Sequence, residues 1–170
     1  GVTRINLKLK STEETEINAN GPVVSAEDFA RLVAYFEANL QLGDVVFLAG
    51  NAGNGMDHQA YTTIAKLCDD KGVKLVLDTT KELLTKCLPY HPFIIKPNHH
   101  ELGEIFGVTI ETEEQIVDYA KKLQEMGARN VLISRGGDGA MLLSETGEVY
   151  TSNVPKGKLV NSVGAGDSML

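Results

Sequence analysis

Apolar and polar side chains alternate along residues 3–20, with Ile5, Leu7 and Leu9 at every second position. A polar turn at residues 11–14 interrupts the alternation, which resumes at Thr15 and Ile17. A period of two predicts a two-stranded antiparallel hairpin with one polar face. Because two strands cannot bury an apolar face by themselves, we expect that face to pack against a partner.

From residue 21 onward, short apolar runs alternate with stretches of helical periodicity. The apolar runs predict strands at 45–49, 74–78, 93–96 and 130–134, and a terminal hairpin over 139–143 and 148–151. The periodic stretches predict helices near 25–40, 57–70, 80–87, 99–106 and 112–127. This alternation indicates an α/β protein built from βαβ units around a largely parallel sheet.

Composition narrows the class of protein further. The chain has 170 residues, of which 42% are hydrophobic, so it can form a sizeable core, and its net charge of −7 argues against a nucleic-acid partner. No long apolar run suggests a membrane span. Cys68 and Cys87 have no metal-type spacing and are expected to be reduced thiols in a cytoplasmic protein. The chain begins without methionine and stops three residues after Asp167, so we expect a fragment of a longer chain.

Candidate chemistry gathers where strands end. In parallel sheets, ligands bind where loops leave the carboxyl ends of the strands. Four such loops, at 50–55, 78–80, 96–101 and 134–139, all carry glycine or polar residues. We therefore expect a ligand site along this edge of the sheet.

The segment Asn161-Ser162-Val163-Gly164-Ala165-Gly166-Asp167-Ser168 combines a glycine-rich turn with a carboxylate. Backbone N–H groups of Gly164, Ala165 and Gly166 can form an anion-binding concavity at a helix N-terminus. Asp167 can take a proton from a hydroxyl while phosphoryl charge develops nearby. The alternative is an ordinary turn in which Asp167 caps a helix.

Two further loops suit phosphate chemistry. Lys96 can neutralise phosphate, and the side-chain oxygens of Asn98 and Glu101 can hold a hydrated Mg²⁺ ion. The alternative is that Asn98 is a helix N-cap and Glu101 closes a capping box. In the loop after residue 133, Ser134 or Arg135 can contact phosphate, although a tight β-turn explains this sequence equally well.

The first strand and the loop at 50–55 complete the candidates. Arg4, Asn6 and Lys8 share one face, which can cover a phosphorylated sugar or simply face solvent. The loop at 50–55 lies between a strand and a helix, as in a dinucleotide-binding unit. Its glycine spacing is Gly-x-x-Gly-x-Gly rather than Gly-x-Gly-x-x-Gly, which leaves an oxidoreductase as a minor alternative.

In combination, these motifs resemble the PfkB carbohydrate kinase family. The resemblance runs in order through Thr3-Arg4-Ile5-Asn6, Lys96-Pro97-Asn98-x-x-Glu101, Ser134-x-Gly136-Gly137-x-Gly139 and Val163-Gly164-Ala165-Gly166-Asp167-Ser168. It implies a ribokinase-like, three-layer αβα fold with a small β lid. Residues 1–20 would be part of the lid and residues 21–170 the kinase core, without the family's N-terminal part and C-terminal helices.

The resemblance also implies an ATP- and Mg²⁺-dependent kinase acting on a ketose phosphate, most like members that convert fructose 1-phosphate to fructose 1,6-bisphosphate. Members acting on tagatose 6-phosphate are the next most similar, and a non-catalytic sugar-phosphate or nucleotide sensor is the alternative from another class. Monovalent-cation activation is left open. The apolar face of the predicted hairpin also predicts a homodimer joined lid to lid, because two strands cannot bury that face alone. We expect the 170-residue chain alone to be inactive.

By the same resemblance, each site residue receives a role. The sugar-phosphate residues would be Arg4, Asn6, Lys8 and also Asn51, which stands in a loop where members usually carry Ser-Gly-Ser-Leu-Pro. Nucleotide-binding residues would be Lys96, Asn98, Ser134, Gly136 and Gly139. Asn98 and Glu101 would organise Mg²⁺ through water. Asp167 would be the base, and the amides of Gly164 to Gly166 would hold the transferring phosphoryl group.

Overall fold

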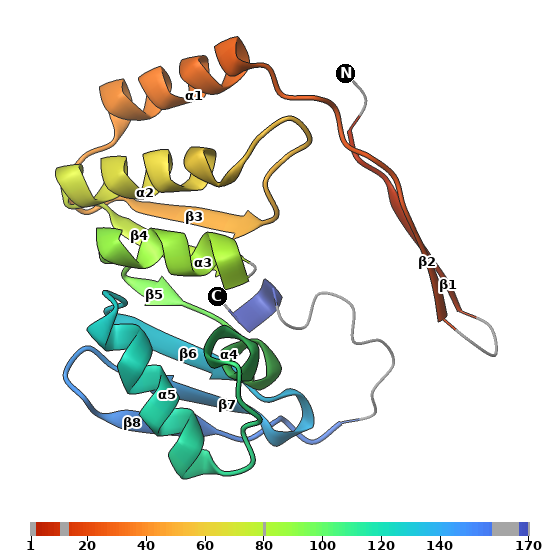
Figure 1. Ribbon diagram of the computed structural model, residues 1–170, viewed down its shortest axis with the longest axis vertical. Helices are drawn as coiled ribbons and strands as arrows, with labels where there is room; N and C mark the ends of the chain where they lie inside the picture. Colours follow the sequence, from red (N-terminus) through yellow and green to blue (C-terminus); the bar gives the residue numbers. More distant parts are fainter. Residues whose placement is uncertain (1–2, 11–13, 80, 158–166, 170) are drawn as a thin grey trace.

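A six-stranded sheet forms the centre of the computed structural model, which describes residues 3–10, 14–79, 81–157 and 167–169 (Figure 1). The strands lie side by side in chain order. They are β3 (Val45–Gly50), β4 (Lys74–Thr79), β5 (Ile94–Ile95), β6 (Asn130–Ser134), β7 (Ala140–Leu143) and β8 (Val149–Ser152). The first four are parallel, whereas β7 and β8 are antiparallel. The predicted α/β class and largely parallel sheet are confirmed.

In the described chain, four helices connect the parallel strands: α2 (His58–Lys71), α3 (Lys81–Cys87), α4 (His99–Phe106) and α5 (Glu113–Glu125). Helix α1 (Ala26–Asn39) precedes β3. Short 3-10 turns are η1 (Leu88–Tyr90), η2 (Gly136–Asp138) and η3 (Asp167–Met169). Ser25 caps α1 through a hydrogen bond from the Asp28 amide, and Thr112 with Gln115 closes a capping box at α5, as predicted. Strand β5 is shorter than predicted: the Lys96 amide still donates to the Leu77 carbonyl over 3.2 Å, and Pro97, which has no N–H to donate, follows it.

The core lies between one face of the sheet and the helices α2, α3 and α5, which Figure 1 shows in front of the strands. Fully buried side chains from both layers include Cys68, Leu77, Leu84, Ile95, Leu123 and Ile133. On the opposite face of β3, Val45 and Phe47 remain 49% and 59% exposed. Of the three predicted layers, the described residues therefore form the sheet and one helix layer.

A separate two-stranded sheet, β1 (Asn6–Lys10) and β2 (Glu14–Asn18), extends away from the six-stranded sheet (Figure 1). The antiparallel register places Leu7 opposite Ile17, and Lys8 opposite Glu16. The predicted hairpin with one apolar and one polar face is confirmed. Its predicted turn lies at residues 11–14, of which 11–13 are outside the described residues. Leu7 and Ile17 are 48% and 53% exposed, so the apolar face has no cover within the described chain.

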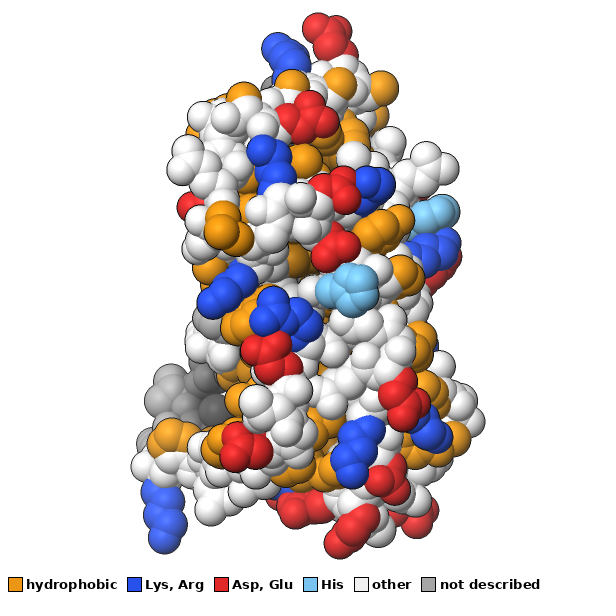
Figure 2. All heavy atoms as spheres, turned by 90° about the vertical axis from the view of Figure 1, so that its left-hand side faces the viewer, with side chains coloured by type: hydrophobic (Ala, Val, Ile, Leu, Met, Phe, Trp, Pro, Cys, Tyr) orange, Lys and Arg blue, Asp and Glu red, His pale blue; other side chains and the backbone are white. Residues whose placement is uncertain are grey.

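The outer surface carries charges of both signs. Figure 2 shows acidic and basic side chains interspersed over most of one face of the molecule. Among the helices of the described residues, none has both the length and the apolar character needed to cross a membrane.

Candidate functional site

Neighbouring strand ends bring the predicted loops into contact along one edge of the sheet. The hydroxyl of Thr79, the last residue of β4, donates a 2.6 Å hydrogen bond to the carbonyl of Gly50, the last residue of β3. On the other side, Asn98 forms a β-bridge with Ser134, whose N–H donates to the carbonyl of Pro97 over 3.2 Å. The parallel register therefore assembles the loops after β3 to β6 into one continuous row.

Lys96 is the buried cation of this row. Its side chain is 8% exposed, and its ammonium lies 3.2 Å from a carboxylate oxygen of Asp78, near the end of β4. A lysine is rarely buried without a partner, because an isolated charge is costly to remove from water. The sequence patterns placed residue 78 at the end of a predicted strand but did not pair it with Lys96. The pairing becomes visible only when β4 and β5 are known to be parallel neighbours.

Asn98 and Glu101 form a capping box at the start of α4. The Asn98 side-chain oxygen accepts from the Glu101 amide over 2.9 Å, and a Glu101 carboxylate oxygen accepts from the Asn98 amide over 2.8 Å. The helix-capping alternative is therefore confirmed for both residues. The box occupies one carboxylate oxygen of Glu101 with a backbone amide, so a metal-organising role requires the same carboxylate to serve two purposes.

The loop between β6 and β7 forms a tight turn. Gly136 has a φ of 58° and Gly139 a φ of 83°, a region that favours glycine. A Cβ atom on Gly139 would lie 1.9 Å from the carbonyl oxygen of Ser152, so the loop approaches the end of β8 closely. The structure also directs the Arg135 guanidinium to Glu113 and to the carbonyl of Asp138, rather than leaving it free to contact phosphate.

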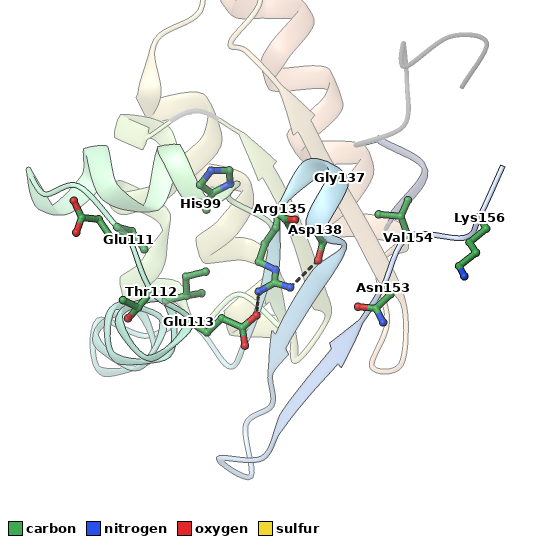
Figure 3. A pocket seen from close by; sticks show the side chains of 12 residues that line it. His99, Glu111, Thr112, Glu113, Arg135, Gly137, Asp138, Asn153, Val154 and Lys156 are labelled. Atoms are coloured by element: carbon green, nitrogen blue, oxygen red, sulfur yellow. Dashed lines mark hydrogen bonds and ion pairs between the residues drawn. The ribbon is translucent and has the colours of Figure 1, made fainter. Parts of the chain in front are cut away.

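A cavity of about 650 Å³ opens beside this loop (Figure 3). Its polar lining comes from α4, the start of α5, the loop after β6 and the segment after β8, and includes His99, Thr112, Arg135, Asp138, Asn153 and Lys156. His99 Nδ1 and Arg135 Nε are buried and have no hydrogen-bond partner among the described residues. The sequence patterns did not single out His99 or the segment at 153–156, because nothing in them marks a shared cavity.

Hydrogen bonds from α2 and from the segment before α1 hold the end of β3 and the loop that follows it. The Tyr61 hydroxyl on α2 donates to the carbonyls of Ala49 and Gly50, at 3.3 and 3.1 Å, and burial raises the pKa of Tyr61. The N–H of Val24 donates to the carbonyl of Asn54 over 2.9 Å, which ties the loop to the segment before α1. Asn51 follows β3 directly and is exposed. It therefore lies at the same sheet edge as Lys96 and Ser134.

The polar face of the hairpin is internally bonded. Arg4 Nε donates to the side-chain oxygen of Asn6 over 3.0 Å and to the carbonyl of Ala19 over 3.1 Å. The Lys8 ammonium lies 2.5 Å from a carboxylate oxygen of Glu16 on the opposite strand, and the hydrogen bond from Lys8 lowers the pKa of the Glu16 carboxyl. Arg4, Asn6 and Lys8 thus share one face of the hairpin, as predicted.

The predicted catalytic segment is described only in part. Gly164, Ala165 and Gly166 lie outside the described residues. Asp167 begins η3, which places a helical turn directly after the glycines, and its side chain is outside the described part.

A parallel α/β sheet whose strand-end loops carry a buried lysine, a capped helix start and a glycine turn is typical of proteins that bind phosphate-bearing ligands. The sequence model of the pfkB family carbohydrate kinases matches residues 2–170, and the chain belongs to this family. This membership replaces the oxidoreductase alternative, which rested on the loop at 50–55.

The chain is similar to several known members. It is 51% identical over all of its 170 residues to a 1-phosphofructokinase of Bacillus subtilis, covering 55% of that protein. It is 36% identical to a D-tagatose-1-phosphate kinase of Bacillus licheniformis, again over the whole chain and 56% of the relative. The chain therefore spans about half the length of these curated relatives.

Solved structures support the fold. A crystal structure of a putative phosphofructokinase from Staphylococcus aureus superposes with a TM-score of 0.83 at 40% identity, over 96% of this chain and 53% of that one. A mutant form of phosphofructokinase-2 of Escherichia coli gives a TM-score of 0.85 at 22% identity, over 96% of this chain and 54% of that one. The second comparison bears on the fold alone.

Proposed function

We propose that the protein containing this chain transfers the terminal phosphoryl group of ATP to fructose 1-phosphate, forming fructose 1,6-bisphosphate. The observation that carries this proposal is the 51% identity to a 1-phosphofructokinase over all 170 residues of the chain. The row of strand-end residues supports it, because it gathers groups suited to phosphate at one edge of the sheet.

On the sugar side, Arg4 binds the phosphate already present on fructose 1-phosphate, assisted by Asn6 and Lys8. The Arg4–Asn6 hydrogen bond holds the guanidinium on the polar face of the hairpin, with further donors available for a bidentate contact to phosphate. Asn51 contacts the sugar from the end of β3. Residues 1–20 act as a lid over the core formed by residues 21–170.

On the nucleotide side, Lys96 neutralises phosphate charge, while Ser134, Gly136 and Gly139 line the nucleotide path. The fit rests on two features of the adjoining cavity: its size, and the buried Nδ1 of His99, which lacks a partner among the described residues. Asn98 and Glu101 present the oxygen ligands that Mg²⁺ prefers and would hold the ion through its water molecules. The ion, when bound, neutralises charge on the phosphate oxygens.

In the reaction, Asp167 takes the proton from the C6 hydroxyl of the sugar as that oxygen attacks the terminal phosphorus of ATP. The bond from this phosphorus to the bridging oxygen breaks, and ADP leaves. Amides of Gly164, Ala165 and Gly166 donate to the transferring phosphoryl oxygens. Such a reaction depends mainly on positioning and charge stabilisation.

The hairpin's exposed apolar face supports a homodimer joined lid to lid. Ile5 and Leu9 extend the face formed by Leu7 and Ile17, and each remains about half exposed or more. Sedimentation of the full-length protein should give a dimer, and Leu7→Glu should shift it toward the monomer. A wild-type monomer at micromolar concentration would contradict this assembly.

The compartment and the monovalent cation are the remaining conditions of the reaction. The free, buried thiols of Cys68 and Cys87 are consistent with the reducing conditions of the cytoplasm. One Escherichia coli phosphofructokinase-2 structure is described as a complex with potassium. Comparing rates in KCl and NaCl tests whether a monovalent cation activates this protein.

A tagatose phosphate is the second candidate acceptor, favoured by the 36% identity to a D-tagatose-1-phosphate kinase. The test follows ADP release by the full-length protein with MgATP and, in parallel, fructose 1-phosphate, tagatose 1-phosphate or tagatose 6-phosphate. A preference for fructose 1-phosphate supports the proposal, and a preference for either tagatose ester replaces the substrate but keeps the mechanism. Binding of ATP and sugar phosphate without turnover would instead indicate a sensor.

A further inference from the structure

Arg135 closes the turn between β6 and β7 on itself. Its backbone N–H donates to the carbonyl of Gly139 over 2.8 Å, and its carbonyl accepts from the amide of Asp138 over 3.1 Å. Its side chain then turns back along the loop, and a terminal guanidinium nitrogen donates to the carbonyl of Asp138 over 2.6 Å. One residue thus bonds the loop at both its start and its end.

The same guanidinium reaches a second element. Figure 3 shows it between the loop and Glu113, the first residue of α5, with which it forms an ion pair. The Arg135 side chain is only 12% exposed, whereas that of Glu113 is 63% exposed. Arg135 is therefore enclosed by the structure, and Glu113 approaches it from the solvent side.

With these contacts, Arg135 can hold the turn in one conformation. A guanidinium is planar and presents its donors in a fixed fork, so two simultaneous contacts define its orientation. Fixing the Asp138 carbonyl also fixes the peptide plane that it shares with the Gly139 amide. Gly139 is already in close approach to the end of β8, so the turn is held from both sides.

We propose that Arg135, supported by Glu113, is a positioning residue that holds the 134–139 loop in its nucleotide-binding conformation. This inference rests on the proposed function, in which Ser134, Gly136 and Gly139 line the nucleotide path. Arg135 acts through the loop and not as a phosphate ligand. Its removal weakens nucleotide binding and leaves the sugar-phosphate site on the hairpin unaffected.

The test compares variants of the full-length protein. Arg135→Met removes the guanidinium but keeps an unbranched side chain, and Arg135→Lys restores a charge without the planar fork. Glu113→Gln removes the charged partner. Glu114→Gln is the matched control, since it removes the same charge from the same helical turn but from a residue with no bond to Arg135.

We expect Arg135→Met to raise the Kd for the non-hydrolysable analogue AMP-PNP and the KM for ATP by about tenfold or more, because misplaced binding groups lose much of their contribution. The kcat at saturating ATP and the KM for the sugar phosphate should stay within about twofold. For Arg135→Lys, the Kd for AMP-PNP and the KM for ATP should lie between the values for the wild-type protein and for Arg135→Met. Glu113→Gln should raise the Kd by only about two- to threefold, since its carboxylate is largely exposed.

Two results would overturn the inference. One is unchanged AMP-PNP binding by Arg135→Met, and the other is a parallel loss in every parameter, which would indicate general destabilisation. If the wild-type protein binds no nucleotide, the proposed function fails. Hydrogen exchange then tests separately whether Arg135 holds the loop in place. In that case the amides of residues 136–139 must exchange faster in Arg135→Met than in Glu114→Gln, with β6 and β7 unchanged.

Discussion

Glu101→Gln separates the two roles that the structure and the proposed function give to one carboxylate. In the structure, Glu101 accepts a hydrogen bond from the Asn98 amide and so completes the capping box of α4. A glutamine carbonyl oxygen can accept the same bond. The protein itself provides the precedent, because Gln115 fills the equivalent position in the capping box of α5.

The expected stability change is therefore small. The variant keeps the cap and loses one negative charge near a helix N-terminus, which costs about 0.3–1 kcal/mol. By contrast, replacing the cap residue in Asn98→Ala should cost roughly 0.5–2 kcal/mol, because the Glu101 amide loses its acceptor. Urea unfolding of the full-length variants measures both changes.

The expected functional change is large. If the carboxylate charge organises Mg²⁺, the Mg²⁺ concentration for half-maximal activity should rise by about 10- to 100-fold in Glu101→Gln, as for other residues that orient metal ligands. Glu104→Gln is the control, because Glu104 lies on the same helix and pairs with Lys81 at 2.9 Å. An unchanged Mg²⁺ dependence in Glu101→Gln would show that the carboxylate serves the helix cap alone, and would refute this reasoning.

Three further predictions concern the loop, the buried cation and the thiols. Gly139→Ala should destabilise the protein and abolish nucleotide binding, because its Cβ would lie 1.9 Å from a carbonyl of β8. A Cβ on Gly137 would meet no atom within 4 Å, so Gly137→Ala should be neutral in thermal unfolding. Lys96→Met should weaken ATP binding by about 10- to 100-fold in calorimetry, because it removes a charge-assisted contact, and undiminished affinity would exclude Lys96 from the nucleotide site. Burial raises the pKa values of Cys68 and Cys87 to about 11, above their values in the unfolded chain. The contribution of the neutral thiols to the free energy of unfolding is therefore fully present below about pH 8.5, and it is lost as the pH rises through 11. Thiol labelling at pH 8 should accordingly be slow until denaturant is added, and rapid labelling of the native protein would contradict the burial.

Local sequence rules predicted the elements well, because they depend on neighbouring residues. Ser25 before an acidic first turn, and Thr112 three residues before Gln115, specify helix starts through bonds within one turn. The same rules stated both roles of Asn98 but could not choose between them, because capping and metal binding require the same residue types.

Contacts between distant segments were beyond those rules. The Asp78–Lys96 pair depends on the alignment of β4 with β5, and the Arg135–Glu113 pair joins residues 22 positions apart. The family resemblance assigned Lys96 and Ser134 to the same predicted nucleotide site, but it did not indicate which side chains hold them in place. Those partners follow from the register of the sheet and the packing of α5.

We propose that this chain carries the base of an ATP-dependent phosphoryl transfer to a sugar phosphate. The most direct test is Asp167→Asn in the full-length protein, measured by ADP release with fructose 1-phosphate and by AMP-PNP titration. We expect turnover to fall by roughly 10²- to 10⁴-fold, the usual contribution of a general base, while the nucleotide Kd stays within about twofold. Turnover within tenfold of the wild-type rate would contradict the claim, and an equal loss of turnover and nucleotide affinity would make Asp167 a structural residue.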